Sequence, residues 1–197
     1  CFYSSLSRSR RCVAPDLRGF NRSTGVTDWT TFTLDDACTD LIAIADAYNF
    51  SSFSLVAHDW GGIVAWHAAR TLGARINNLV ILNAPEPQLF QHHLYTFPDQ
   101  RAASQYANLL ASPGAHERIA PNGPKDLWNR LYLEHTQSGV LKEVDKTTFL
   151  QSWSRPNAIR EMLGWYRAPI FDVPGAHAPY TSPGEETEFD TNKTRPL

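Results

Sequence analysis

The chain has 197 residues, of which 42% are hydrophobic and 19% are charged, and its formal net charge is −2. This length allows one domain with a sizeable core, and the near-neutral charge provides no basic surface for nucleic acid or an anionic membrane. No stretch approaches the ~18 consecutive apolar residues of a membrane-spanning helix.

The two ends of the chain suggest a piece of a longer protein. The first residues, CFYSSLSRSRR, do not begin with Met and contain no apolar signal segment. The last thirty or so residues are rich in proline and have a loop composition. The three cysteines (Cys1, Cys12 and Cys38) cannot form a paired disulfide framework, which predicts reduced thiols and a cytoplasmic location.

The first elements of the chain are a short apolar run and an amphipathic helix. Residues 11–16 predict a buried strand, followed by a turn-rich loop. Residues 34–48 predict a helix, with Thr33 and Asp36 arranged like a capping box at its start. The apolar stripe expected on this helix comprises Leu34, Ala37, Cys38, Leu41, Ala45 and Tyr48.

Two further strands flank a second helix. Residues 53–57 predict a strand, and a helix follows from about Gly62 to Leu72 with Gly73 as its C-cap. Residues 79–83 predict the third strand. Strands that alternate with helices indicate parallel βαβ units with right-handed crossovers.

The pattern changes to helices alone after Pro85. Helices are expected at 99–111, 125–135, 146–153 and 157–166. The predicted fold class is therefore α/β, with a helical module that follows the third strand.

The corner between residues 57 and 61 is the first candidate site. In the stretch LVAHDWGGIVAW, Asp59 lies directly after a strand and before a helix, at the sheet edge where parallel sheets bind ligands. Ala57 and Gly61 complete the small–x–nucleophile–x–small pattern of a nucleophile elbow. An ordinary helix N-cap is the alternative role for Asp59. Trp60 favours the functional role, because a capping turn does not need an indole.

Three segments in order and spacing make the pattern more specific. APDLRGF (14–20), HDWGG (58–62) and LVILNAP (79–85) resemble the α/β-hydrolase enzymes with an Asp nucleophile, namely epoxide hydrolases and haloalkane or haloacetate dehalogenases. The resemblance covers essentially the whole chain. It implies an incomplete α/β-hydrolase fold with a helical cap inserted after the third visible strand.

The resemblance also implies a division of the chain. Residues 1–84 would form a partial core with the nucleophile elbow, and residues 85–180 would form the helical cap, or lid. Residues 181–197 would be an irregular tail that leads toward a missing part of the core.

For the site, the resemblance implies that Asp59 is the nucleophile and that the backbone N–H of Trp60 forms half of the oxyanion hole. The elbow geometry would rest on Ala57, His58, Gly61 and Gly62. A carboxylate is already ionised at pH 7, so attack on an epoxide needs no general base. Hydrolysis of the resulting ester needs a base-activated water.

Two tyrosines are expected to activate the epoxide oxygen. Tyr106 in ASQYANLLASPGAHE and Tyr166 in GWYRAP resemble the two cap tyrosines of epoxide hydrolases. A phenol donates a hydrogen bond and stays protonated at neutral pH. Taken singly, each tyrosine is more often a core or interface aromatic, but the pair favours ring opening. Trp60 and Trp165 would line a pocket for a small apolar epoxide or halogenated substrate.

Other parts of the family pattern are absent. The chain contains no HG-x-P segment, and none of its seven histidines stands in the context of the catalytic base. His177 is the remaining, weak candidate for that base. We therefore expect the chain to form the ester at Asp59 and to stall there.

Two alternatives remain open. One is a haloalkane or haloacetate dehalogenase, in which Trp60 would bind the halide. The other is a non-catalytic remnant that only binds a ligand or a partner. The sequence shows no nucleotide-binding G-x-G-x-x-G, and no spacing of metal ligands, so we expect neither cofactor nor metal. It does not determine the oligomeric state.

Overall fold

The structure is a computed structural model that describes residues 2–23, 28–168 and 170–180. Cys1 and the tail expected at 181–197 lie outside these residues. The first half of the chain contains α1 (Phe2–Leu6), the 3-10 helix η1 (Trp29–Thr31), α2 (Leu34–Ala47), β1 (Phe53–His58), α3 (Trp60–Thr71), the 3-10 helix η2 (Gly73–Arg75) and β2 (Ile76–Leu82). The second half contains α4 (Pro87–Thr96), α5 (Pro98–Ala103), α6 (Gln105–Ala111), α7 (Ala115–Ile119), α8 (Pro124–Gln137), α9 (Glu143–Trp153), α10 (Ala158–Met162) and α11 (Gly164–Arg167).

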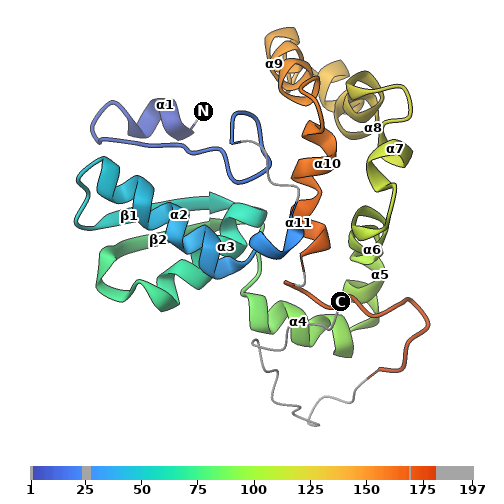
Figure 1. Cartoon of the computed structure of the whole chain (residues 1–197), viewed down its shortest axis with the longest axis horizontal. Coiled ribbons are helices and arrows are strands. Elements are labelled where there is room, and N and C mark those ends of the chain that lie inside the picture. The colour runs from blue at the N-terminus through green and yellow to red at the C-terminus, as the bar shows by residue number, and fades with distance from the viewer. Residues whose placement is uncertain (1, 24–27, 169, 181–197) are drawn as a thin grey trace.

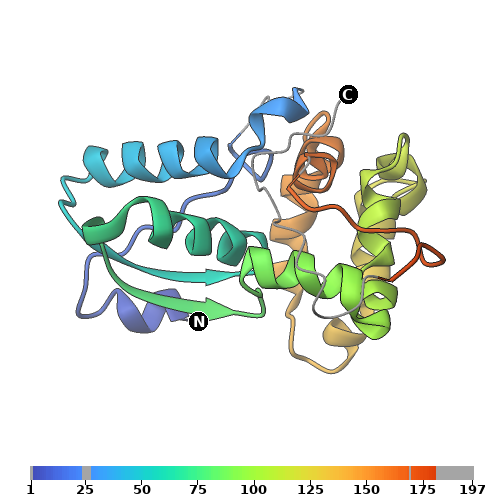
Figure 2. The ribbon, with the colours of Figure 1, turned by 90° about the horizontal axis from the view of Figure 1, so that it is seen from below.

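The sheet of the described residues consists of two parallel strands, β1 and β2. Val56 pairs with Val80 in the register, and both valines are about half exposed. Helices α2 and α3 cover one face of the strands, and α1 lies on the other side (Figure 2). The crossover from β1 through α3 to β2 is the parallel βαβ unit that the sequence predicts.

The buried strand predicted at 11–16 is wrong. The segment forms no regular element, and Arg11 and Pro15 are exposed. An extended segment becomes a strand only when a neighbour satisfies its backbone hydrogen bonds, and neither described strand pairs with this segment. Its anchor is instead Arg11, which donates to the Tyr48 carbonyl at 3.0 Å and lies over the Phe50 ring.

The first predicted helix is confirmed as α2. The Thr33 hydroxyl accepts a hydrogen bond from the Asp36 N–H at 3.0 Å, which caps the helix as expected. Its buried side includes Ala37, Cys38 and Ala45. Tyr48 does not belong to the buried stripe: it is 47% exposed, because it is the C-cap and lies beyond the last helical turn.

The helices after Pro85 stand beyond the carboxyl ends of the two strands (Figures 1 and 2). The helix predicted at 99–111 is broken at Ser104, and the one predicted at 157–166 is broken at Leu163. At the second break, a Cβ added to Gly164 would lie 2.6 Å from the Phe32 ring. The backbone therefore approaches the core too closely for a regular side chain, which explains why the helix changes direction there.

Helix α4 was not predicted, because Pro85 and Pro87 suggest a turn. Pro87 instead occupies the first turn of the helix, where a missing N–H costs nothing. The Glu86 carboxylate caps the helix by accepting the Leu89 N–H at 2.8 Å. The short helix α7 was also missed.

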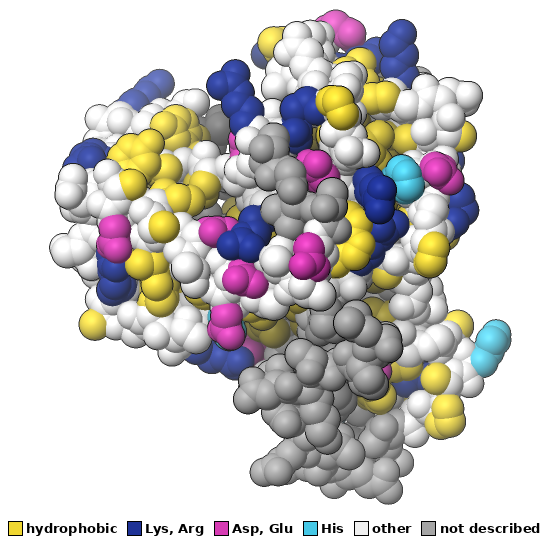
Figure 3. Space-filling view, in the orientation of Figure 1, with side chains coloured by type: hydrophobic (Ala, Val, Ile, Leu, Met, Phe, Trp, Pro, Cys, Tyr) yellow, Lys and Arg dark blue, Asp and Glu magenta, His cyan; other side chains and the backbone are white. Residues whose placement is uncertain are grey.

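Two clusters of buried apolar side chains hold the molecule together. The first lies among the later helices and comprises Ala115, Ile119, Leu127, Trp128, Trp153 and Leu163. The second joins the two halves of the chain and comprises Phe32, Ala37, Val64, Trp165 and Ala168. On the face seen in Figure 3, acidic and basic side chains are interspersed. None of the helices in the described ranges is long and apolar enough to span a bilayer.

Candidate active site

Asp59 occupies the corner between β1 and α3 in a strained backbone conformation. Its φ of 52° and ψ of −126° belong to a backbone region that residues other than glycine rarely adopt. The conformation is held from both sides: the Asp59 N–H donates to Leu82 in β2 at 3.3 Å, and its carbonyl accepts from Gly62 and Ile63 in α3. The turn therefore presents the exposed carboxylate beyond the strand end.

The backbone of the next residue fixes the carboxylate. The Trp60 N–H donates to Asp59 Oδ2 at 2.7 Å. A charge-assisted bond of this kind is stronger than one between neutral groups. One carboxylate oxygen is thus oriented by the start of α3.

Gly62 is the glycine that the close packing of this corner requires. A Cβ at Gly62 would lie 2.4 Å from the Cβ of Ala84 and 3.3 Å from Ile81, whereas a Cβ at Gly61 meets no described atom within 4 Å. Ala57 is half-buried and pairs with Ile81, and His58 is exposed. The close approach expected at Gly61 therefore occurs one residue later.

The Trp60 ring lies within a group of aromatic side chains that come from the distant C-terminal part of the chain. Ring centroids lie 5.8 Å from Trp60 to Trp165, 5.3 Å to Tyr166 and 6.0 Å to Phe171. Tyr106 of α6 extends this group, because its ring lies 6.1 Å from that of Tyr166. We call these five residues the aromatic cluster.

The two sequence-predicted tyrosines are therefore brought together. Tyr106 is 56% exposed, and Tyr166 is half-buried against Trp60. Partial burial raises the pKa of the Tyr106 phenol, and the negative charge of Asp59 adds to this rise.

Tyr166 has the larger shift. Burial raises the pKa of Tyr166 to about 12, with smaller rises from Tyr106 and from the Asp59 charge. A side-chain hydrogen bond with Trp60 acts in the opposite direction. The net effect is that the Tyr166 phenol stays protonated at neutral pH.

Trp165 is fully buried and lies behind Trp60. Its indole N–H donates to the Arg18 carbonyl at 3.0 Å, and its ring packs edge-on against Phe32. Trp165 therefore supports the Trp60 ring from the core side.

Sequence reasoning missed two residues near the corner. Tyr132 of α8 was taken for an ordinary core aromatic, yet the charge of Asp59 contributes to the raised pKa of its phenol, after burial. Phe171 was not singled out within the predicted cap, yet its ring contacts Trp60. Local patterns do not identify either residue, because only the tertiary fold brings them to Asp59.

The histidines have other contacts. His67 binds Asp35 at 2.7 Å, His93 packs on Phe97 and His116 lies 3.8 Å from Glu117. His177 is exposed in the segment after Gly175. Across the described ranges, no three His, Cys, Asp or Glu side chains gather in an arrangement that could hold a metal ion.

A cavity of about 520 Å³ opens elsewhere, between the loop at 16–22 and α9. Its lining is polar and comprises Asp16, Asn21, Arg22, Thr148, Gln151, Ser152 and Arg155. It is separate from the corner at Asp59.

Comparison with known proteins agrees with the architecture. A family model described as alpha/beta hydrolase fold matches residues 1–185. The chain is 29% identical to mouse epoxide hydrolase 4 over 189 residues, which cover 91% of this chain and 53% of that protein. It is 27% identical over 158 residues to the AB hydrolase superfamily protein YfhM of Bacillus subtilis, covering 80% of this chain and 55% of that protein. The chain thus spans about half the length of these curated relatives.

Solved structures give the same result. One of a group of epoxide hydrolases from metagenomes of hot environments superposes with a TM-score of 0.80 at 34% identity, covering 94% of this chain and 62% of that chain. An inhibitor complex of the Bacillus megaterium epoxide hydrolase also gives a TM-score of 0.80, at 25% identity, with 94% of this chain and 65% of that chain covered.

Proposed function

The chain belongs to the α/β-hydrolase fold family, and on this premise we propose that it is an epoxide hydrolase-like hydrolase in which Asp59 is the nucleophile. Its similarity to proteins named epoxide hydrolases supports the reaction class. The observation that carries the proposal is the Asp59 corner, where a strained turn holds a carboxylate beside two phenols that sense its charge.

The oriented carboxylate suits nucleophilic attack. Oδ2 accepts the Trp60 N–H, so Oδ1 is the oxygen that attacks the epoxide carbon. The new C–O bond forms as the ring C–O bond breaks, and the electron pair of that bond moves to the epoxide oxygen. Oδ2 then becomes the carbonyl oxygen of the ester, already bound to the Trp60 N–H. This is half of an oxyanion hole for ester hydrolysis.

Tyr166 and Tyr106 stabilise the negative charge on the epoxide oxygen. The Tyr166 ring packs edge-on against Trp60 and lies 6.1 Å from the Tyr106 ring, so the two phenols lie close enough together to donate to one epoxide oxygen. The raised pKa of both phenols keeps these hydrogens in place at neutral and moderately alkaline pH.

The same reasoning assigns roles to the two parts of the chain. Residues 1–84 act as the partial core that carries the nucleophile, and residues 85–180 act as the cap that carries the tyrosines. The aromatic side chains of Trp60, Tyr166 and Phe171 favour a small apolar epoxide, with Trp165 supporting them from behind.

Ester hydrolysis is the step for which this chain offers least. No described histidine has a contact that makes it the base for a water at Asp59, and His177 is exposed in a loop. We expect the ester to form and then persist on this polypeptide.

A dehalogenase is the less favoured function. Halide binding needs N–H donors that are free in the resting site, and Trp60 is the donor that this alternative requires. Its backbone N–H is bonded to Asp59.

The test is trapping of the ester. The purified chain is incubated with styrene oxide, and the adduct is detected by intact mass and located by peptide mapping. We expect one substrate-derived group on Asp59, and none at this position in Asp59→Asn, which keeps every other nucleophile. An adduct absent from Asp59 in the wild type would refute the nucleophile. Release of bromide from 1-bromobutane without reaction of styrene oxide would favour the dehalogenase.

A further inference from the structure

The segment that follows α11 carries a side chain into the aromatic cluster. Phe171 lies 6.0 Å from Trp60, with the two rings inclined by 31°. Trp60 directly follows Asp59, so Phe171 stands two side chains away from the proposed nucleophile. Its ring is half-buried.

Helix α4 also contacts Phe171 and the residue that follows it. The Phe90 ring packs edge-on against Phe171 at 5.1 Å and 90°. Gln91, the next residue of α4, holds the backbone of Asp172: its amide nitrogen donates to the Asp172 carbonyl at 2.7 Å, and its amide oxygen accepts the Asp172 N–H at 2.8 Å. Tyr95, one turn further along, hydrogen-bonds the Asp172 carboxylate.

The rest of the segment is tied down by the same region of the fold. We call residues 172–180 the strap. The strap carbonyls of Val173 and Pro174 accept hydrogen bonds from Asn108 and Gln105 at 3.1 and 2.9 Å.

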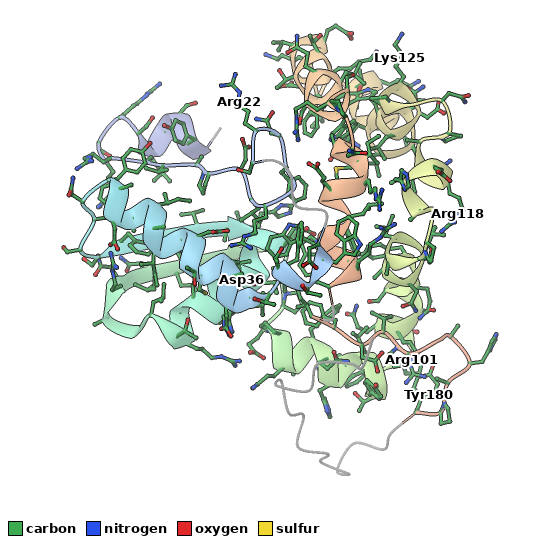
Figure 4. All side chains as sticks on the ribbon, viewed as in Figure 1. Arg22, Asp36, Arg101, Arg118, Lys125 and Tyr180 are labelled. Carbon is green, nitrogen blue, oxygen red and sulfur yellow. The ribbon has the colours of Figure 1, made fainter. Side chains whose placement is uncertain are left out.

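Arg101 anchors the far end of the strap. It is fully buried, and it donates to the carbonyls of Ala178 and Pro179 as well as to those of Leu94 and Tyr95. Its guanidinium lies 3.8 Å from the centre of the Tyr180 ring, and Figure 4 shows the two side chains together near the end of α5.

Helix α4 is in turn connected to the helix that begins at the nucleophile corner. Arg70 in the last turn of α3 binds the Glu86 carboxylate at 2.7 Å, and Glu86 caps α4. The contacts form a closed circuit, from the start of α3 along that helix to α4, from Gln91 to Phe171, and back to Trp60. Helix α3 therefore helps to fix the position of Phe171, through α4, as well as that of Asp59.

We propose that Phe171 is the specificity-determining wall of the Asp59 site and that Gln91 is the residue that positions it. The proposal rests on the function proposed above and adds the substrate class. Phe171 packs against both Trp60 and Phe90. We therefore expect the site to accept an epoxide that carries a single aromatic ring or a short alkyl group, and to disfavour one that carries a fused bicyclic group.

Gln91 is suited to this task because its amide pairs with both backbone groups of one residue, the N–H and the carbonyl of Asp172. Gln105 and Asn108 only donate to strap carbonyls, whereas Gln91 both donates and accepts at Asp172. Two bonds in opposite directions fix the orientation of the backbone directly after Phe171. Loss of both bonds removes the restraint on the Asp172 backbone, and the segment is then held on α4 by the ring of Phe90 and by the bond from Tyr95 to the Asp172 carboxylate.

The test compares the rates of Asp59 ester formation with styrene oxide and with 2-naphthyl glycidyl ether. Phe171→Ala removes the wall, and we expect the ratio of the naphthyl rate to the styrene rate to rise about tenfold, a typical scale for a changed apolar pocket. Gln91→Leu, nearly equal in size, should raise the ratio in the same direction by a smaller factor. The double variant should behave like Phe171→Ala alone, because Gln91 acts through Phe171.

Gln105→Leu is the matched control. It removes a hydrogen bond from a side-chain amide to the strap, but the acceptor, the Pro174 carbonyl, lies three residues beyond Phe171. We expect it to keep the wild-type ratio. An equal change in this control would mean that any loosening of the strap has the effect and would overturn the role of Gln91. An unchanged ratio in Phe171→Ala would overturn the wall.

A second measurement separates this proposal from the nucleophile assignment. The diols that correspond to the two epoxides cannot form the ester at Asp59. Their dissociation constants therefore measure the effect of Phe171 on binding, separately from any reaction. If styrene oxide never reacts at Asp59 but Phe171→Ala still improves binding of the naphthyl diol about tenfold, the nucleophile fails and the wall stands. If the ester forms while diol selectivity and rate ratio both stay unchanged, the wall fails and the nucleophile stands.

Discussion

Asp59 has a backbone conformation that costs free energy. With φ at 52° and ψ at −126°, its backbone lies where a Cβ is crowded and only glycine is unstrained. Such strain persists because β2 and α3 hold the corner from both sides. The sequence could predict the corner from its spacing, but the strain itself is a property of the folded backbone.

This strain predicts a difference between two substitutions at the same position. Asp59→Gly and Asp59→Ala both lose the hydrogen bond to the Trp60 N–H, but only glycine relieves the backbone. We expect Asp59→Gly to be more stable than Asp59→Ala by about 1–2 kcal/mol in urea unfolding. Equal stability of the two variants would show that the corner is not strained.

Tyr166 predicts a pH dependence of stability. Its pKa is about 12 in the folded protein and 10.0 for the unperturbed group, so the fold favours the neutral phenol. The unfolded chain releases this proton first as the pH rises. The contribution is therefore complete below pH 10 and is lost between about pH 10 and 12, by about 3 kcal/mol in total.

Urea unfolding at pH 9.5 and 11.5 measures this loss. Tyr166→Phe should lose less stability over the interval than the wild type, because it has no proton to release at this site. Tyr48→Phe, a change at the exposed end of α2, is the control and should follow the wild type. A wild-type loss in Tyr166→Phe would contradict the assignment.

At the scale of elements, the sequence predicted those whose packing is local. Both strands and α2 and α3 were found, because β1, α3 and β2 are consecutive and each shows its own periodicity. The strand expected at 11–16 failed, because strand formation depends on a neighbour rather than on the segment itself. The breaks at Ser104 and Leu163 were missed, because both lie within segments whose residues are compatible with one continuous helix. The close approach of Gly164 to Phe32 is visible only in the folded chain.

The candidate site divides in the same way. Asp59 and Trp60 were accessible to sequence reasoning because the corner is a local motif. Tyr166 and Tyr106 required a likeness to known enzymes, because nothing in their own helices distinguishes them from core aromatics. No sequence pattern identified Phe171. Its proposed role depends on the contacts of Phe90 and Gln91 in α4, a helix that the sequence did not predict.

The packing of α3 against β2 predicts opposite effects for two adjacent glycines. Gly62→Ala places a Cβ 2.4 Å from the Cβ of Ala84, and we expect a loss of about 1–3 kcal/mol of stability from overpacking. Gly61→Ala meets open space, and it should be neutral or stabilising by up to about 1 kcal/mol because alanine favours the helix. Thermal unfolding of both variants checks the pair. Similar losses in the two would contradict the close approach at Gly62.

At the scale of the whole molecule, the face of the sheet opposite α2 and α3 exposes apolar side chains. Val56 and Val80 form a cross-strand pair and are 48% and 49% exposed. Helix α1 lies on this side of the strands but leaves these two valines about half exposed. An exposed apolar pair on a two-stranded sheet favours association between copies. The overall charge of −2 offers little repulsion against it.

We therefore expect the isolated chain to self-associate through this face. The double variant Val56→Thr/Val80→Thr keeps the β-branched shape and adds hydroxyls, so it should shift sedimentation toward the monomer. Leu131→Thr on the exposed side of α8 changes an equally exposed apolar side chain elsewhere and serves as the control. Unchanged association in the double variant would exclude the sheet face as the contact.

The hydrogen bond from Trp165 to the Arg18 carbonyl has a consequence for folding during synthesis on the ribosome. Phe32 and Val64 belong to a cluster that Trp165 and Ala168 complete, so the early half of the chain waits for residues made more than a hundred positions later. At bacterial or eukaryotic rates of synthesis this delay is on the order of ten seconds. Throughout that interval the nascent polypeptide displays uncovered aromatic side chains. We therefore expect chaperones that act during translation to bind it, and the cluster is completed when Trp165 and Ala168 emerge.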